Sequence, residues 1–124
     1  MSKPISTVLI VEDEPLICLM LCDMLEACGV QLCHQAHTLR EARHYLDTVQ
    51  LDAVLLDINL AGISSLPFAG ELARRQIPFA FTTGYGQTSN EPFPTAPALR
   101  KPFMQDQVKM VLDQLANAGP GKAS

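Results

Sequence analysis

Short apolar runs alternate along the chain with longer stretches in which apolar residues recur every three or four positions. Short runs rich in Val, Ile and Phe are typical of strands buried on both faces of a parallel sheet, whereas the wider spacing predicts amphipathic helices. The predicted strands cover residues 7–11, 30–36, 53–57, 79–82 and 98–100. The predicted helices cover about 15–27, 38–49, 65–76 and 105–117.

This alternation predicts an α/β fold, a doubly wound parallel sheet with right-handed crossovers and helices on both faces. The connection between the last two strands differs from the others. Three prolines and two glycines lie between residues 84 and 97, and both residue types disfavour a regular helix. The fourth helix of the alternation is therefore predicted to be short or absent.

A length of 124 residues predicts a single domain, 1–124, with a core over about 5–117 and a flexible tail at 118–124. The net charge is −4 and the basic residues are scattered, which argues against nucleic acid as a main partner. There is no signal peptide and no apolar run of membrane-spanning length, so we expect no membrane partner and a cytoplasmic location. The four cysteines are expected to be reduced.

The helix predicted over 15–27 has more apolar positions than one buried stripe requires. The positions expected to face the sheet are Ile17, Met20, Leu21, Met24 and Cys28. This leaves Leu16, Leu19 and Cys22 on other faces, where they form a candidate partner-binding surface. A helix set deeply between neighbours would explain the same surplus.

The run 54–56 leads directly into Asp57, which places a carboxylate at the end of a buried strand. Ligands of open parallel sheets bind outside the carboxyl ends of the strands, so Asp57 is a candidate nucleophile. Taken alone, the same residue also fits a turn or a helix cap, which is the commoner role for such an Asp.

Other strand ends carry residues that change this balance. Glu12 and Asp13 follow the first strand, Thr83 ends the fourth and Lys101 follows the fifth. Three carboxylates in one crevice repel one another, and a hard divalent ion such as Mg²⁺ relieves the repulsion. Lys101 offers a positive charge for a phosphate and Thr83 offers a hydroxyl. Together these residues fit a carboxylate that attacks a phosphoryl group.

This ordered set resembles the receiver domain of two-component response regulators over about residues 5–117. The resemblance implies a flavodoxin-like sheet of order 2-1-3-4-5 and phosphoryl transfer from a sensor histidine kinase to Asp57, followed by hydrolysis. It also implies Mg²⁺ or Mn²⁺ held by Glu12, Asp13, Asp57 and the backbone carbonyl of Asn59. Thr83 would hydrogen-bond the phosphoryl group and Lys101 would pair with it.

Residues 81–85, Phe-Thr-Thr-Gly-Tyr, resemble the Phe-Ala-Thr-Gly-aromatic signature of a receiver subfamily, often stand-alone, described in alphaproteobacteria. Ala98 departs from the family, since many receivers carry a switch Tyr or Phe at that position. We therefore expect the loop that contains Gly84, Tyr85 and Gly86 to report the phosphorylation state instead.

Three other functions fit the sequence less well. A haloacid-dehalogenase-like phosphatase would need a second Asp two residues after its nucleophile, where this chain has Asn59. A pseudo-receiver that never takes phosphate is disfavoured because every chemical position is filled. A nucleotide-binding domain has only a bare Gly-x-Gly in its favour. As a receiver without a second domain, the chain would signal through a histidine phosphotransferase or a target protein, or act as a phosphate sink, as a monomer or weak dimer.

Overall fold

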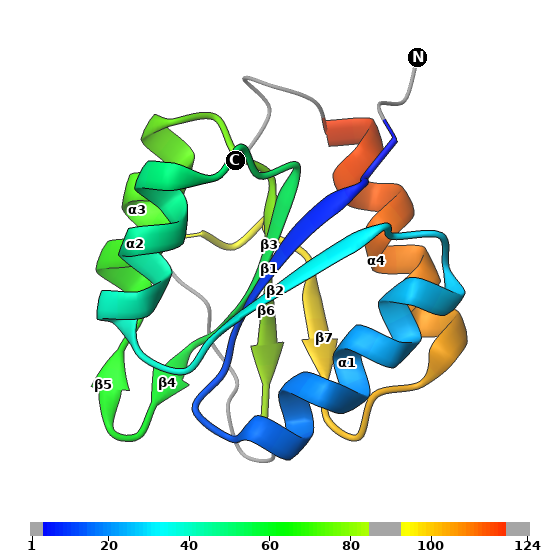
Figure 1. Ribbon diagram of the computed structural model, residues 1–124, viewed down its shortest axis with the longest axis horizontal. Coiled ribbons are helices and arrows are strands. Elements are labelled where there is room, and N and C mark those ends of the chain that lie inside the picture. Colours follow the sequence, from blue (N-terminus) through cyan, green and yellow to red (C-terminus); the bar gives the residue numbers. More distant parts are fainter. Residues whose placement is uncertain (1–3, 85–92, 119–124) are drawn as a thin grey trace.

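The computed structural model describes residues 4–84 and 93–118. Strands and helices alternate along the chain, as the apolar pattern predicts (Figure 1). The elements are β1 (Thr7–Val11), α1 (Pro15–Ala27), β2 (Leu32–Ala36), α2 (Leu39–Thr48), β3 (Ala53–Asp57), β4 (Asn59–Leu60), β5 (Ile63–Ser64), α3 (Leu66–Arg74), β6 (Phe79–Thr83), β7 (Ala98–Arg100) and α4 (Gln105–Ala118).

The main sheet has the strand order β2-β1-β3-β6-β7, and all of its neighbouring strands are parallel. This order confirms the predicted 2-1-3-4-5 topology. Two further short strands, β4 and β5, form a separate antiparallel hairpin directly after β3. The carboxyl ends of the sheet strands, the hairpin and the start of α1 lie together at the bottom of Figure 1.

Successive residues of each central strand enter two different cores. Residues such as Val8, Ile10 and Leu55 pack with α1 and α4, whereas their neighbours Leu9 and Val54 pack with α2 and α3. Figure 1 shows the two pairs of helices on opposite sides of the sheet. Because both faces of β1 and β3 are covered, their sequences are continuous apolar runs.

The buried face of α1 is rotated relative to the predicted one. Its buried residues are Cys18, Leu21, Cys22 and Leu25. Cys22 is therefore part of the core, and its predicted place on a partner-binding surface is wrong. Met20, predicted to face the sheet, is instead 43% exposed. Cys18 and Cys22, one helical turn apart, are buried in the core cluster with residues of β1 and β3, where they act as small hydrophobic residues.

Several predicted boundaries shift. β2 begins at Leu32, and α3 ends at Arg74, just before Gln76 takes a left-handed backbone conformation with φ of 60°. The helix α4 includes Ala118, which was assigned to the tail, and residues 119–124 lie outside the described part. No helix occurs between β6 and β7 in residues 84 and 93–97, which are described. None of the described helices combines the length and apolar character needed to cross a bilayer.

Candidate functional site

Three carboxylates meet at the carboxyl edge of the sheet. Glu12 and Asp13 follow β1, and Asp57 ends the adjacent strand β3, so the parallel pairing of β1 with β3 brings them together. One oxygen from each of the three lies within 4.8 Å of the others. Among the described residues, this is the group of acidic, histidine and cysteine side chains placed to hold a metal ion.

Lys101 provides the positive charge of the site. Its backbone N–H donates to the carbonyl of Thr83 at 2.9 Å, which continues the pairing of β7 with β6. Its Nζ lies 3.0 Å from Glu12 Oε1 and donates a hydrogen bond to Asp57 Oδ2 at 3.3 Å. The structure thus brings Lys101 to Asp57, as the sequence predicts.

The burial of these groups makes their charges costly. Glu12 is only 1% exposed and Asp57 5%. Burial raises the pKa of Glu12 to about 7, the negative charge of Asp57 adds to the rise, and the contact with Lys101 opposes it. Burial alone would lower the pKa of Lys101, but its contacts with Glu12 and Asp57 outweigh that effect and raise it.

A hollow of about 430 Å³ opens onto these residues. Its lining comes from four segments of the chain, namely Asp13, Glu14, Asp57, Asn59, Ala61, Gly62, Gly84 and Lys101. Thr83 is buried at the end of β6 and does not line the hollow, whereas its neighbour Gly84 does. The other two predicted switch residues, Tyr85 and Gly86, lie outside the described residues.

The residues at the site fit a hard divalent cation. They supply three carboxylates against one ammonium group, and their oxygen atoms are the donors that Mg²⁺ and Mn²⁺ prefer. A cation stabilises crowded, largely buried carboxylates, because without it their negative charges repel one another. The carbonyl of Asn59, predicted as a further ligand, belongs to a residue at the rim of the hollow.

Two hydroxyl residues at the site were not predicted. Ser65 is completely buried and donates through Oγ to the carbonyl of Asp57. Thr82 is the register partner of Asp57 on β6, and its buried Oγ1 has no hydrogen-bond partner among the described residues. No sequence motif marks Ser65, and Thr82 stands within the 81–85 motif at the position where the signature has Ala, so the motif does not single it out.

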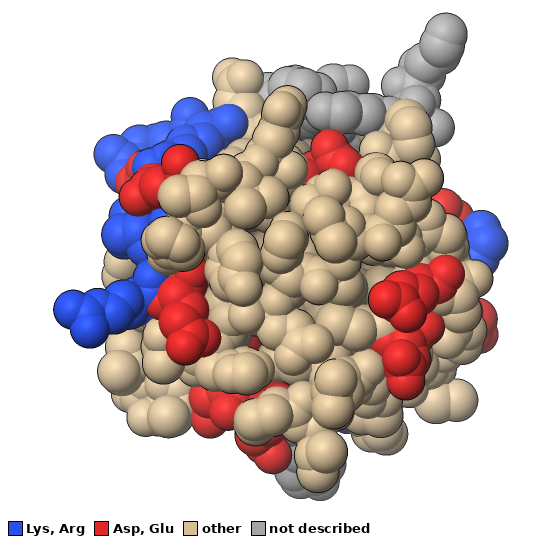
Figure 2. Space-filling model, viewed as in Figure 1, with Lys and Arg blue, Asp and Glu red and all other residues tan. Residues whose placement is uncertain are grey.

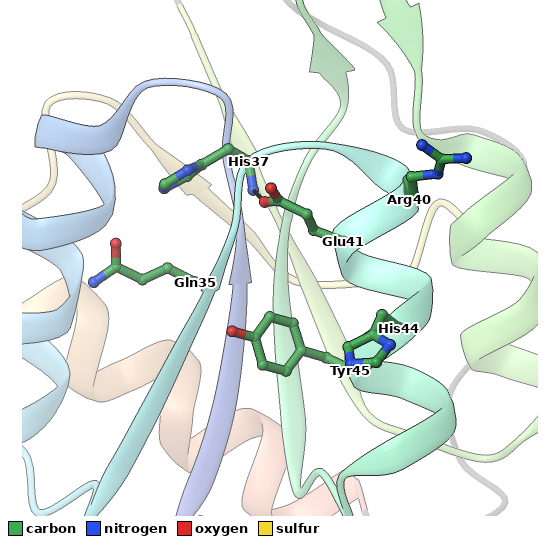
Figure 3. Close-up of a pocket in the computed structure, with 6 residues that line it drawn as sticks. All are labelled: Gln35, His37, Arg40, Glu41, His44 and Tyr45. Carbon is green, nitrogen blue, oxygen red and sulfur yellow. Dashed lines mark hydrogen bonds between the residues drawn. The ribbon is translucent and has the colours of Figure 1, made fainter.

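A second hollow, of about 540 Å³, lies between β2 and α2, and its lining includes His37 and His44. Figure 3 shows that its polar side chains do not converge. Gln35 and His37 point to one side, while Arg40 and His44 point to the other. The carboxylate of Glu41 accepts the backbone N–H of His37 at 2.7 Å, so it serves the start of α2. Among the described residues, the side chains that line this hollow therefore do not form a convergent polar site.

Charged side chains are unevenly spread over the face of the molecule seen in Figure 2. Lys and Arg side chains gather over α2 and α3, with Asp and Glu side chains among them, whereas Asp and Glu side chains lie over α1. On α1, Leu16 is 79% exposed and Leu19 is 52% exposed. With Met20, they form an exposed apolar face beside the carboxylate hollow, which we call the α1 face.

The model of the response regulator receiver domain family matches residues 8–112. The chain belongs to this family. Receiver domains are phosphoacceptor switches of two-component signalling, and the strand order and the carboxylate cluster agree with that family. A comparison with curated proteins found no match.

Solved receiver structures are similar over nearly the whole chain. The solution structure of SdrG from Sphingomonas melonis Fr1 is 40% identical, with a TM-score of 0.81 over 90% of this chain and 96% of that chain. The receiver domain of PhyR from Erythrobacter litoralis is 30% identical, with a TM-score of 0.80 over 94% and 93%. The BeF3-activated conformation of SdrG from Pseudomonas melonis Fr1 is 38% identical, with a TM-score of 0.79 over 92% and 98%.

Proposed function

We propose that this receiver domain accepts a phosphoryl group on Asp57 from the phosphohistidine of a sensor histidine kinase. An oxygen of Asp57 attacks phosphorus, a P–O bond forms and the P–N bond to the histidine breaks. The imidazole leaves with the electron pair and takes up a proton. Hydrolysis of the resulting acyl phosphate then resets the domain.

The observation that carries this proposal is the position of Asp57. It lies in an open hollow, with Lys101 Nζ at 3.3 Å from Oδ2, and the backbone N–H of Asn59 donates to Oδ1 at 3.1 Å. Both oxygens are thus oriented before a phosphodonor arrives, and such positioning accounts for much of the catalysis in phosphoryl transfer.

We further propose that Glu12, Asp13, Asp57 and the Asn59 carbonyl hold Mg²⁺ or Mn²⁺. The ion would neutralise the charge that develops on the phosphoryl oxygens. In the metal-bound state Lys101 is free to pair with the phosphoryl group, because the ion takes over its neutralising role toward Glu12. Thr83 is proposed to donate its hydroxyl to the phosphoryl group.

Intact mass measurement tests the proposal. The protein is incubated with acetyl phosphate and Mg²⁺, and wild type is compared with Asp57→Asn. We expect a single phosphoryl adduct that hydroxylamine removes, present in wild type and absent from the variant. Omission of Mg²⁺ should abolish it. If wild type gains no adduct from acetyl phosphate or from a kinase, the chain is a pseudo-receiver that binds partners without phosphate.

The α1 face is the proposed docking surface for the kinase or a histidine phosphotransferase. Its apolar residues Leu16, Leu19 and Met20 are exposed and stand next to the hollow that holds Asp57. Exposed apolar patches of this kind mark protein-binding sites. Only a partner seated close to the hollow can deliver its phosphohistidine to Asp57.

A transfer assay with a panel of autophosphorylated histidine kinases tests this surface. Leu16→Glu should slow transfer from the kinase and leave labelling by acetyl phosphate unchanged, because the small donor needs no docking. Leu32→Glu is the matched control, since Leu32 is 50% exposed but lies on β2. Equal effects of the two substitutions on kinase transfer would contradict the docking role.

The segment 84–97 is proposed to report the phosphorylation state. Gly84 lines the hollow, and at the far end of the segment the Phe93 ring packs on Phe79 with ring centres 5.5 Å apart. A change at Asp57 can therefore reach an anchored segment through Gly84. Addition of beryllofluoride and Mg²⁺ should shift the amide resonances of this segment, and unchanged resonances would refute its role.

A further inference from the structure

Ser65 stands just before α3 but does not cap that helix. Its side chain makes no hydrogen bond to the N–H groups of the first turn of α3. The hydroxyl points back to the end of β3, where Oγ lies 2.5 Å from the carbonyl oxygen of Asp57 and 3.1 Å from that of Ile58. A serine directly before a helix commonly accepts a backbone N–H from the first turn of that helix. The Ser65 hydroxyl instead contacts the backbone carbonyl of Asp57, the proposed phosphoacceptor.

The neighbouring Ser64 supplies the interaction that Ser65 leaves out. Its Oγ accepts the backbone N–H of Leu66, the first residue of α3, at 3.2 Å. Ser64 is exposed, whereas Ser65 is completely buried. The two adjacent serines thus make different hydrogen bonds, Ser64 to the start of α3 and Ser65 to the end of β3.

The Ser65 contacts close a loop that begins at Asp57. Asp57 is the last residue of β3, so the peptide after it leaves the sheet and enters the β4–β5 hairpin. At the base of the loop, the Ser65 N–H donates to the Ile58 carbonyl at 2.9 Å, next to the contacts of its hydroxyl. The backbone of residues 57 and 58 is therefore held from the far end of the hairpin.

The tip of the hairpin is fixed as well. Ala61 and Gly62 have φ of 49° and 89°, the left-handed conformations of a two-residue hairpin turn. The Gly62 N–H donates to Asn59 Oδ1 at 2.8 Å. Asn59 is thus held through its side chain, while its own N–H donates to Asp57 Oδ1. Restraint at the base and tip fixes the peptide that orients the Asp57 carboxylate.

We propose that the Ser65 hydroxyl is a positioning residue for phosphorylation of Asp57. By holding the Asp57 carbonyl, it fixes the peptide from which the Asn59 N–H reaches Oδ1 and sets the place of the Asn59 carbonyl at the rim. This inference rests on the proposed phosphoryl transfer to Asp57. Small displacements of a reacting group lower rates strongly, so loss of one remote hydroxyl should be visible in kinetics.

The test compares Ser65→Ala with Ser64→Ala, two substitutions that each remove one hydroxyl from adjacent residues. The rate of labelling by acetyl phosphate with Mg²⁺ should fall by about tenfold in Ser65→Ala and by less than about twofold in Ser64→Ala. Thermal unfolding of both variants identifies any general loss of structure. Ser65→Thr, which keeps a hydroxyl, should recover labelling if it unfolds at the wild-type temperature.

Spectroscopy supplies a readout that does not depend on labelling. The amide resonance of Asn59 should move in Ser65→Ala and stay in place in Ser64→Ala, and its titration with Mg²⁺ should show weaker binding only in Ser65→Ala. Wild-type kinetics and an unmoved Asn59 resonance in Ser65→Ala would overturn the inference. If wild type takes no phosphoryl group, the proposed function fails, while the Asn59 resonance and the Mg²⁺ titration still decide whether Ser65 positions this backbone.

Discussion

Two hollows lined by described residues differ in what their side chains do. The hollow at the ends of the strands is the smaller, about 430 Å³ against 540 Å³ between β2 and α2. In the smaller one, Asp57 and Lys101 come from separate strand ends and meet at 3.3 Å. In the larger one, Gln35 and Arg40 point away from each other (Figure 3). Convergence of charges, and not volume, distinguishes the candidate functional site.

The difference has a topological cause. Parallel strands end at one edge of a sheet, so residues far apart in sequence are brought together there. The second hollow is built from two consecutive elements, β2 and α2, and its lining is a local stretch of the chain. One of its polar groups serves the start of the helix, because the Glu41 carboxylate accepts the His37 N–H at 2.7 Å.

Substitution of one carboxylate in each hollow should give the largest contrast. Asp13→Asn removes one of the three proposed carboxylate ligands and should weaken Mg²⁺ binding by at least about tenfold. Glu41→Gln, in the second hollow, should leave the affinity within about twofold of wild type. Calorimetric titration measures both. A similar loss in the two variants would mean that Mg²⁺ responds to overall charge and not to a built site.

Substitution of a lysine should lower stability more at the carboxylate site than at an isolated surface ion pair. Lys101→Met leaves buried Glu12 and Asp57 without their cation and should cost about 2 kcal/mol of unfolding free energy without metal. Lys109→Met removes an exposed pair with Asp113, at 3.2 Å, and should cost less than about 0.5 kcal/mol. Urea unfolding checks the difference. Equal losses of unfolding free energy would show that the contacts of Lys101 stabilise the fold no more than an exposed ion pair does.

Two threonines should respond with opposite sign. Thr82→Val keeps the shape of the side chain and removes a buried hydroxyl that has no hydrogen-bond partner in the described part of the chain, so stability should rise by about 1 kcal/mol. Thr38→Val removes the hydroxyl that caps α2 and should lower stability by about 1 kcal/mol. Thermal or urea unfolding measures both changes. A stability loss in Thr82→Val would reveal a partner for its hydroxyl in solution.

The turn of the β4–β5 hairpin should give the smallest effect. Ala61 has φ of 49°, which a residue with a side chain adopts at a cost, so Ala61→Gly should raise stability by about 0.5 kcal/mol. Ala69→Gly, in the buried interior of α3, should lower it by about 1 kcal/mol or more. Urea unfolding separates these signs. A lower stability of Ala61→Gly would mean that the flexibility of the unfolded chain outweighs the relieved strain.

Much of the fold was predictable because it depends on local pattern. The apolar runs at 7–11, 53–57 and 79–83 form central strands because only a sheet covered on both faces accepts them. Pro15 at the start of α1 and the Thr38 cap at the start of α2 are likewise local signals, and the structure has both helices begin there. The strand-end carboxylates were predictable for the same reason, once the strands were known.

Tertiary structure decided the remaining features, because they depend on distances between segments that are separated along the chain. Cys22 is buried because it packs in the core with residues of β1, β3 and α4, and pattern alone placed it on the wrong face. The contact of Ser65 with Asp57 requires the hairpin to fold back across the residues between them. The sequence shows two ordinary serines before a helix, and only packing makes one of them part of the proposed phosphoacceptor site.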